Sequence, residues 1–179
     1  MEKGFSNDQV MIRIAFTGPE SSGKSSLCEF AAKRLQAPHC SEYARSFLDQ
    51  QDGKYQQADL LHLAKEQFRR ISDDNVKGDL FLIDTELLVI KIWSLEIYGN
   101  CDPEILKLIE KQQIDLYVLC TPDIPWEPDP LRVNPSDRMR LFERYKEELE
   151  FYQFPYIIVS GSMEDRFQQV HTEIQKRFH

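Results

Sequence analysis

The feature that most constrains the fold of this chain is the eight-residue stretch GPESSGKS at positions 18–25. It directly follows the apolar run 10–16, whose β-branched residues are typical of a buried strand. After it, apolar residues recur at helical spacing from Leu27 to Leu35, until Pro38 ends the pattern. The sequence therefore predicts a strand, a glycine-rich turn and a helix in immediate succession.

The spacing Gly18-x4-Gly23-Lys24-Ser25 matches the phosphate-binding P-loop. In such a loop, backbone N–H groups form a concave nest and the following helix points its positive end toward phosphate groups. We expect Lys24 to reach the β- and γ-phosphates of ATP and the Ser25 hydroxyl to bind Mg²⁺. Because kinases, GTPases and motor ATPases share this loop, it does not identify the reaction. The expected nucleotide-binding residues are Gly18, Ser21, Ser22, Gly23, Lys24, Ser25 and Ser26.

The rest of the chain alternates between short apolar runs and helical patterns. Predicted strands lie at 80–84, 116–120 and 156–159, and predicted helices at 57–76, 87–98, 103–112, 138–152 and from 163 onward. Strands that are apolar along nearly their whole length and alternate with helices indicate a parallel sheet covered on both faces. The predicted fold is a three-layer α/β/α sandwich.

Length, charge and cysteines limit the class of protein. A chain of 179 residues is most simply one domain, here 10–179 after a short lead at 1–9. Its net charge of −8 argues against a nucleic-acid partner. The four cysteines form no CxxC pair, and no apolar run reaches the roughly 18 residues that a membrane span needs. We expect a cytoplasmic protein with reduced thiols and no membrane partner.

Two carboxylates are candidates for the chemistry. Asp84 ends a predicted strand, where a carboxylate can hold Mg²⁺ in a P-loop protein. The alternative is that Asp84 or Thr85 caps the next helix. Glu42 follows the first helix, in a segment that we expect at a strand end beside the P-loop strand, where it could accept a proton from a hydroxyl group. Alternatively, Glu42 and Arg45 simply form a pair on a surface turn.

The segment 121–138 has the composition of a lid. It contains five prolines between 121 and 135, which exclude a regular helix or a central strand there. Phosphoryl transfer requires positive charge on the transferring group and exclusion of water, and Arg132 and Arg138 could supply the charge. A plain surface loop with incidental arginines is the alternative. Trp126 could stack on an aromatic ligand or only pack the loop.

These motifs together resemble the ribosylnicotinamide kinase domain of NadR-type proteins over nearly the whole chain. The resemblance is carried by GPESSGKS, EYAR at 42–45, LFLIDT at 80–85, DLYVLCTPDIPW at 115–126, DPLR at 129–132 and IIVSG at 157–161. It implies a P-loop nucleoside-kinase fold and ATP-dependent phosphorylation of the 5′-hydroxyl of nicotinamide riboside. Larger members of this group carry further domains, for which this chain has no room.

The resemblance also implies roles for particular residues. Gly18, Gly23, Lys24 and Ser25 would hold ATP and Mg²⁺; Asp84 and Glu42 would be the acidic site residues; Arg132 and Arg138 would belong to the lid; Tyr43, Arg45 and Trp126 would lie near the nucleoside. Pro130 stands where the family lid usually has glycine, and a proline stiffens the turn.

Three functions are compatible with the sequence. The first is a kinase for nicotinamide riboside, in which Asp84 or Glu42 serves as general base. The second is a kinase for another nucleoside or nucleotide, since only the acceptor pocket would differ. The third is a nucleotide-dependent regulatory ATPase without a small acceptor. Homo-oligomerisation and the choice between ATP and GTP stay open.

Overall fold

The computed structural model describes residues 11–127 and 137–178, and its centre is a five-stranded sheet. The strands are β1 (Ile12–Thr17), β2 (His39–Cys40), β3 (Leu80–Asp84), β4 (Leu116–Cys120) and β5 (Tyr156–Val159). They lie in the order β2-β3-β1-β4-β5, and every pairing is parallel. All five strands therefore end at the same edge of the sheet, with β1 in the middle.

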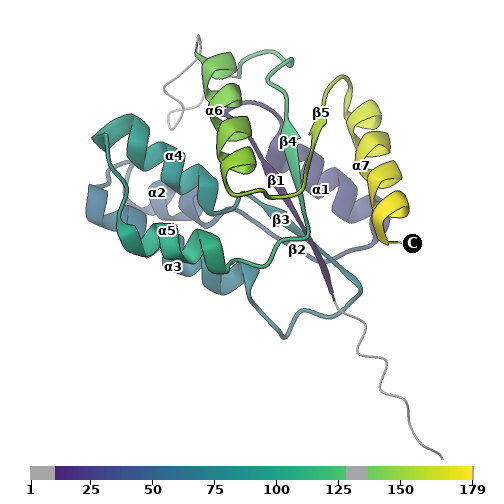
Figure 1. Cartoon of the computed structure of the whole chain (residues 1–179), viewed down its shortest axis with the longest axis horizontal. Coiled ribbons are helices and arrows are strands. Elements are labelled where there is room, and N and C mark those ends of the chain that lie inside the picture. The colour runs from purple at the N-terminus through teal and green to yellow at the C-terminus, as the bar shows by residue number, and fades with distance from the viewer. Residues whose placement is uncertain (1–10, 128–136, 179) are drawn as a thin grey trace, which may run out of the picture.

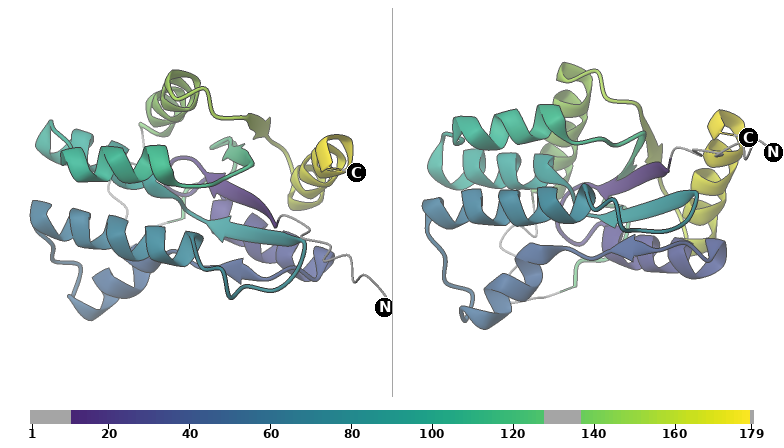
Figure 2. Two further views of the ribbon diagram at one scale, coloured as in Figure 1. Left: turned by 60° about the horizontal axis from the view of Figure 1, so that its bottom comes forward. Right: turned by 90° about the horizontal axis from the view of Figure 1, so that it is seen from below.

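Helices cover both faces of this sheet. They are α1 (Lys24–Leu35), α2 (Tyr43–Gln50), α3 (Gln57–Ile71), α4 (Leu87–Tyr98), α5 (Pro103–Lys111), α6 (Arg138–Phe151) and α7 (Met163–Phe178). Figures 1 and 2 show α1 and α7 on one side of the strands and α3 to α6 on the other. The expected three-layer α/β/α sandwich is confirmed.

Alternate residues of β1 build the two cores. Ile14 and Phe16 pack with buried residues of α1 and α7, whereas Ala15 packs with those of α3 to α6. This division follows from the geometry of a strand, in which successive side chains point to opposite faces. Because all three residues are fully buried, β1 holds the loop that follows it on a rigid support.

Two expectations about the segment after α1 are wrong. In the part of the sheet that is described, β2 is the edge strand and pairs with β3, so it does not lie beside the P-loop strand β1. Hydrophobic periodicity detects a strand but carries no information about its neighbours. The helix α2 was not expected, although Ala44 and Leu48 are both buried and stand four residues apart.

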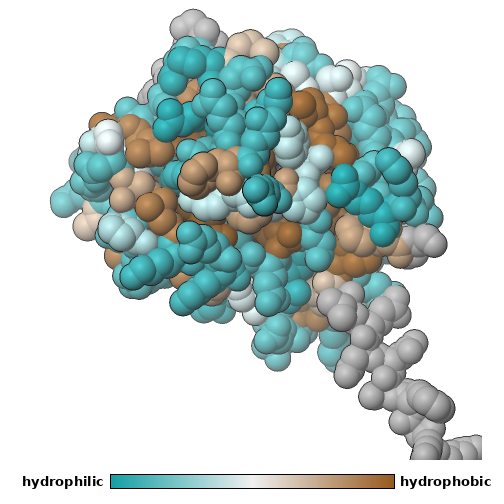
Figure 3. Space-filling model, viewed as in Figure 1, coloured by the Kyte–Doolittle hydropathy of each residue, from teal (hydrophilic) through white to brown (hydrophobic). Residues whose placement is uncertain are grey.

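The face of the molecule in Figure 3 is hydrophilic over much of its area, with hydrophobic side chains in several separate groups. The large apolar residues that are most exposed within the described ranges are Phe151, Met139, Ile97 and Ile158. None of the helices described is both long enough and apolar enough to cross a membrane.

Candidate active site

The loop between β1 and α1 has a backbone that favours glycine at two points. Gly18 has φ +134°, and a Cβ there would lie 2.9 Å from the Cys120 carbonyl oxygen of β4. Gly23 has φ +78° and occupies the N-cap position of α1, where no side-chain cap is formed. The N–H groups of the first turn of α1 therefore remain available to an anion such as a phosphate group.

Two arginines bind the carbonyl groups of this loop from outside. Arg138 of α6 donates from Nη1 to the Ser21 and Ile124 carbonyl oxygens, both at 3.0 Å. Its guanidinium also lies 5.7 Å from the centre of the Trp126 ring. Arg166 of α7 donates to the Ser22 carbonyl oxygen at 2.6 Å. Arg138 and Trp126 thus meet beside the P-loop, whereas Arg132 lies outside the described residues.

Lys24 and Ser25 begin α1, and Asp84, the last residue of β3, interacts with both. Lys24 Nζ donates to the Pro19 carbonyl oxygen at 3.3 Å, inside the loop. Burial raises the pKa of Asp84 above its ordinary value, while the positive charge of Lys24 acts in the opposite direction. Hydrogen bonds from Ser25 and Thr85 also favour the charged form of this carboxyl group. Asp84 is therefore the residue that links Lys24 and Ser25 electrostatically.

This arrangement fits a bound Mg²⁺. The Ser25 hydroxyl and the Asp84 carboxylate supply the oxygen ligands that Mg²⁺ prefers, and substrate phosphates usually supply others. Ser22 Oγ, in the same loop, is buried and makes no hydrogen bond within the described part of the chain. The described ranges contain no group of three or more His, Cys, Asp or Glu that could hold an ion without a substrate.

The helix that follows Asp84 is capped by a different residue from the two expected. Glu86 accepts a hydrogen bond from the Leu88 N–H at 2.7 Å, so neither Asp84 nor Thr85 is the cap of α4. The other Glu86 oxygen accepts from the Thr17 hydroxyl at 2.8 Å. Burial raises the pKa of Glu86 to about 7. The alternative capping role for Asp84 is therefore wrong, and its carboxylate stays beside Ser25.

A cavity of about 250 Å³ opens next to the P-loop. Its lining begins at Gly18, Lys24 and Ser25 and includes Glu42 and Arg45. The remaining described lining residues are Pro19, Glu20, Ser21, Ala44, Leu48, Gly53, Tyr55, Val89, Ile92, Trp93, Glu96, Ile97, Leu141 and Tyr145. The phosphate-binding residues and a pocket large enough for part of a small molecule are therefore continuous.

Three of the predicted substrate residues are not on this cavity. Asp84 is buried beside Ser25 and is not among the described lining residues. Trp126 lies beside Arg138 on the loop after β4. Tyr43 is turned toward α3, where its ring lies 4.6 Å from the Arg70 guanidinium and its hydroxyl 3.3 Å from His62 Nε2. Of the predicted substrate residues, Glu42 and Arg45 are the two that line the cavity.

Several cavity residues were not predicted. Trp93 donates from its indole nitrogen to the Tyr55 hydroxyl at 2.9 Å, and the two rings meet edge to face at 4.7 Å. Glu96 forms an ion pair with Arg140 of α6. Trp93 and Glu96 belong to one stripe of α4, together with Val89 and Ile92, at the helical spacing i, i+3, i+4 and i+7. This spacing is visible in the sequence, but it does not distinguish a cavity from a core.

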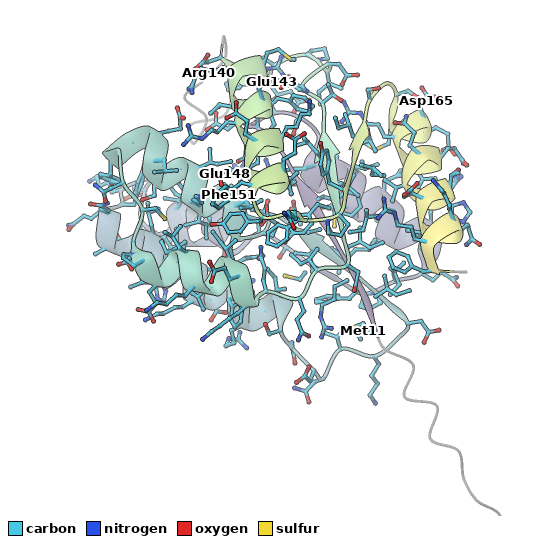
Figure 4. The ribbon with its side chains drawn as sticks, in the orientation of Figure 1. Met11, Arg140, Glu143, Glu148, Phe151 and Asp165 are labelled. Atoms are coloured by element: carbon cyan, nitrogen blue, oxygen red, sulfur yellow. The ribbon has the colours of Figure 1, made fainter. Side chains whose placement is uncertain are left out.

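Figure 4 shows how these elements are oriented. Met11, just before β1, lies at one end of the molecule, whereas Arg140 of α6 and Asp165 of α7 lie at the other. The P-loop follows the carboxyl end of β1, as do the loops after β3 and β4 at their own strands. In open parallel sheets, ligands bind outside the carboxyl ends of the strands. The cavity has this position.

Residues 13–166 match the AAA_28 family, which is described as an AAA domain. The chain belongs to this family. The trifunctional NAD biosynthesis/regulator protein NadR of Salmonella typhimurium strain LT2 is 28% identical to the AAA_28 chain over 127 residues. That alignment covers 66% of this chain and 30% of NadR, so the chain spans less than a third of its relative. The expected resemblance to NadR-type proteins is confirmed.

Solved structures show the same fold. A crystal structure of NadR protein in complex with NR superposes with a TM-score of 0.69 at 18% identity, over 90% of the AAA_28 chain and 51% of that chain. A deoxyadenosine kinase from M. mycoides with the products dcmp and dcdp gives a TM-score of 0.64 at 16% identity, over 92% of this chain and 100% of that one. The fold is therefore that of P-loop nucleoside kinases.

The site of this AAA_28 domain combines two chemically distinct parts. One part offers helix N–H groups, a lysine and oxygen ligands, which suit a nucleotide and its metal ion. The other part offers aromatic and charged side chains around a cavity, which suit a small polar molecule with a ring. Because Lys24, Ser25 and Glu42 all line the same cavity, the two parts meet where a phosphoryl group could pass between two ligands.

Proposed function

We propose that this protein is an ATP-dependent small-molecule kinase whose acceptor is nicotinamide riboside, converted to nicotinamide mononucleotide. The main support for the proposal is that the cavity is continuous with the P-loop. Lys24 and Ser25 of the loop region line the same cavity as the residues around the proposed acceptor position. The similarity to NadR and the NadR structure in complex with NR support this acceptor. The fold shared with a deoxyadenosine kinase supports a nucleoside-type acceptor in general.

The chemistry of the cavity wall favours a positively charged aromatic ring. Tyr55, Trp93 and Tyr145 supply aromatic side chains, and aromatic faces attract cations. The nicotinamide ring of the riboside carries a positive charge, unlike the bases of common nucleosides. The aromatic side chains of the lining therefore support this acceptor over a neutral one.

We assign the two carboxylates different roles. Glu42 lines the cavity and would accept the proton of the acceptor hydroxyl. Asp84 is buried beside Ser25, and these two residues would hold Mg²⁺, which supplies positive charge to the phosphates when it is bound. Lys24 would leave the Pro19 carbonyl to bind the phosphate chain. Catalysis then depends on positioning and charge neutralisation.

The remaining predicted roles belong to the lid. Arg138 contacts the P-loop through Ser21, so we assign it to holding the base of the segment 121–138 against the loop. Arg132 falls outside the described residues, and its contact with the phosphates stays a prediction. Tyr43 is turned toward α3 and does not line the cavity, so we assign it the role of holding α2, which supplies lining residues, against α3.

The proposal is tested by incubating the protein with ATP, Mg²⁺ and nicotinamide riboside and measuring the mass of the riboside. We expect it to gain one phosphoryl group, with ADP formed in equal amount. Lys24→Ala should abolish the reaction, whereas Lys33→Ala, at an exposed position later in α1, should not. Phosphorylation of deoxyadenosine in place of the riboside would correct the acceptor and keep the kinase. ATP hydrolysis without any phosphorylated acceptor would instead indicate a regulatory ATPase.

A further inference from the structure

The side chain of Arg166, in the first turns of α7, is buried and engaged at every nitrogen. Nε donates to the Gly161 carbonyl oxygen at 3.0 Å, and Nη1 donates to that of Ser22 at 2.6 Å. Nη2 donates to the Thr121 carbonyl oxygen at 2.9 Å and also pairs with the Asp123 carboxylate. Only 2% of the Arg166 surface is exposed. A buried guanidinium of this kind is tolerated because each of its nitrogens donates at least one hydrogen bond and its charge is paired with Asp123.

The partners of Arg166 come from three loops that are neighbours in space. Ser22 belongs to the P-loop after β1, Thr121 and Asp123 to the loop after β4, and Gly161 to the turn after β5. These three strands lie side by side in the sheet. Asp123 also accepts a hydrogen bond from the Gly161 N–H at 2.7 Å, which closes the connection between the last two loops. A single guanidinium therefore ties together three adjacent strand ends.

The contact with Ser22 bears directly on the P-loop. A loop binds phosphate through its N–H groups, so its carbonyl oxygens must point elsewhere and still find donors. Arg166 supplies the donor for the Ser22 carbonyl, and a Cβ built on Gly23 would lie 3.5 Å from Arg166 Nη1. The guanidinium thus lies directly against the back of the loop. No other cation could be substituted without losing some of these bonds, because only arginine presents five donors in a fixed fork.

We propose that Arg166 is the positioning residue of the nucleotide site: it holds the Ser22 carbonyl and the two neighbouring loops so that the P-loop keeps its phosphate-binding shape before a nucleotide arrives. The inference rests on the proposed binding of ATP at this loop. We assign Arg166 no contact with the phosphates or with the acceptor. It acts through the backbone of Ser22.

The position of Arg166 predicts that a substitution there affects the binding of one substrate more than that of the other. It lies on α7, on the opposite face of the sheet from α4 and α6, which line the acceptor cavity (Figure 2). Arg166 is not itself part of the cavity lining. A change at Arg166 should therefore weaken nucleotide binding and leave acceptor binding nearly unchanged. A purely structural role would instead lower thermal stability without separating the two substrates.

The test compares Arg166→Lys with Arg177→Lys, the same change at an exposed ion pair later in the same helix. ADP binding is measured by calorimetry, and the KM values for ATP and for nicotinamide riboside are measured separately. We expect Arg166→Lys to weaken ADP binding and raise the KM for ATP at least about tenfold, because hydrogen bonds from charged groups are lost. The KM for the riboside should stay within about twofold, and Arg177→Lys should change neither.

A second variant guards against a failure of Arg166→Lys to fold. Asp123 is partly exposed, and asparagine at this position keeps one oxygen that can accept from Arg166. The substitution Asp123→Asn removes the negative charge and the second carboxylate oxygen, which accepts from the Gly161 N–H. It should weaken ADP binding in the same direction, by about threefold. Unchanged ADP binding in both variants, or an equal rise in both KM values, overturns the inference. If the wild type binds ADP but does not phosphorylate the riboside, the proposed acceptor fails while the calorimetry still decides the role of Arg166.

Discussion

At the scale of single residues, two carboxylates near the P-loop have different surroundings. Asp84 is buried at the end of β3, and its pKa is raised by that burial although Lys24 and Ser25 favour the charged form. Glu42, the residue before α2, lines the cavity into which the acceptor is proposed to bind. Both follow strands that end at the same edge of the sheet, so sequence position alone does not assign their roles.

Replacing Glu42 with glutamine tests its assignment as the general base. We expect Glu42→Gln to lower kcat for the riboside by about 10²- to 10⁴-fold, the usual contribution of a general base. ADP binding measured by calorimetry should not change, because Glu42 does not belong to the P-loop. The matched control is Glu147→Gln, at an exposed position on α6. A kcat within about threefold of the wild type would contradict the assignment and favour Asp84.

At the scale of elements, the acceptor cavity depends on how α4 and α6 are held together. Lys91 of α4 pairs with Glu148 of α6 and donates to the Tyr152 hydroxyl at 3.2 Å. The side chains of Lys91 and Glu148 are only 12% and 11% exposed. Figure 4 shows Glu148 on α6, at the side where this helix faces α4. Removing one partner of such a pair leaves the other charge buried.

We therefore expect Lys91→Met to lower the free energy of unfolding by about 3 kcal/mol, near the low end for a broken buried pair, since Arg144 also lies close to Glu148. Lys65→Met, which breaks the exposed pair with Glu104, should lower it by less than about 1 kcal/mol. Urea denaturation at pH 7 measures both values. Equal effects of the two substitutions would show that the Lys91 pair does not hold α4 and α6 together.

The same pair predicts a pH dependence. Burial by itself lowers the pKa of Lys91, but hydrogen bonds to Glu148 and Tyr152 outweigh it and raise this pKa above the ordinary value of 10.5. A raised folded-state pKa means that the contribution is fully present below pH 10.5 and is lost as the pH rises through the folded value. The stability difference between wild type and Lys91→Met should therefore be constant near neutral pH and shrink above pH 10.5.

At the scale of the whole molecule, the sequence is sufficient for the layers but not for the order of the strands. The alternation of apolar runs and helical patterns predicts the three-layer sandwich. Strands that are apolar along their whole length must be buried on both faces, and the amphipathic helices between them supply the covering layers. This alternation does not predict that β2, a strand of two residues, pairs with β3 at the edge of the sheet. The order of strands in a parallel sheet depends on how the connecting helices pack, which the pattern of a single strand does not show. The helix α2 was missed because it follows that short strand without a glycine or proline between them.

The sequence likewise predicts some residues of the candidate site and not others. The P-loop and Asp84 are predictable because they follow strands and have a fixed spacing. Trp93 and Tyr55 are not, because a tryptophan on an apolar helix reads equally well as core. Arg166 gives no sequence signal, since its function comes from three loops that meet only in the folded chain.

We propose that this molecule transfers a phosphoryl group from ATP to a cationic nucleoside in the cavity beside the P-loop. The most direct measurement is a competition in one vessel, with nicotinamide riboside, adenosine, deoxyadenosine and thymidine at equal concentration and each product quantified by mass. Initial product ratios report the relative kcat/KM values. We expect nicotinamide mononucleotide to form at least about a hundredfold faster than any other product. Preferential phosphorylation of a neutral nucleoside, or no phosphorylated nucleoside at all, would contradict it.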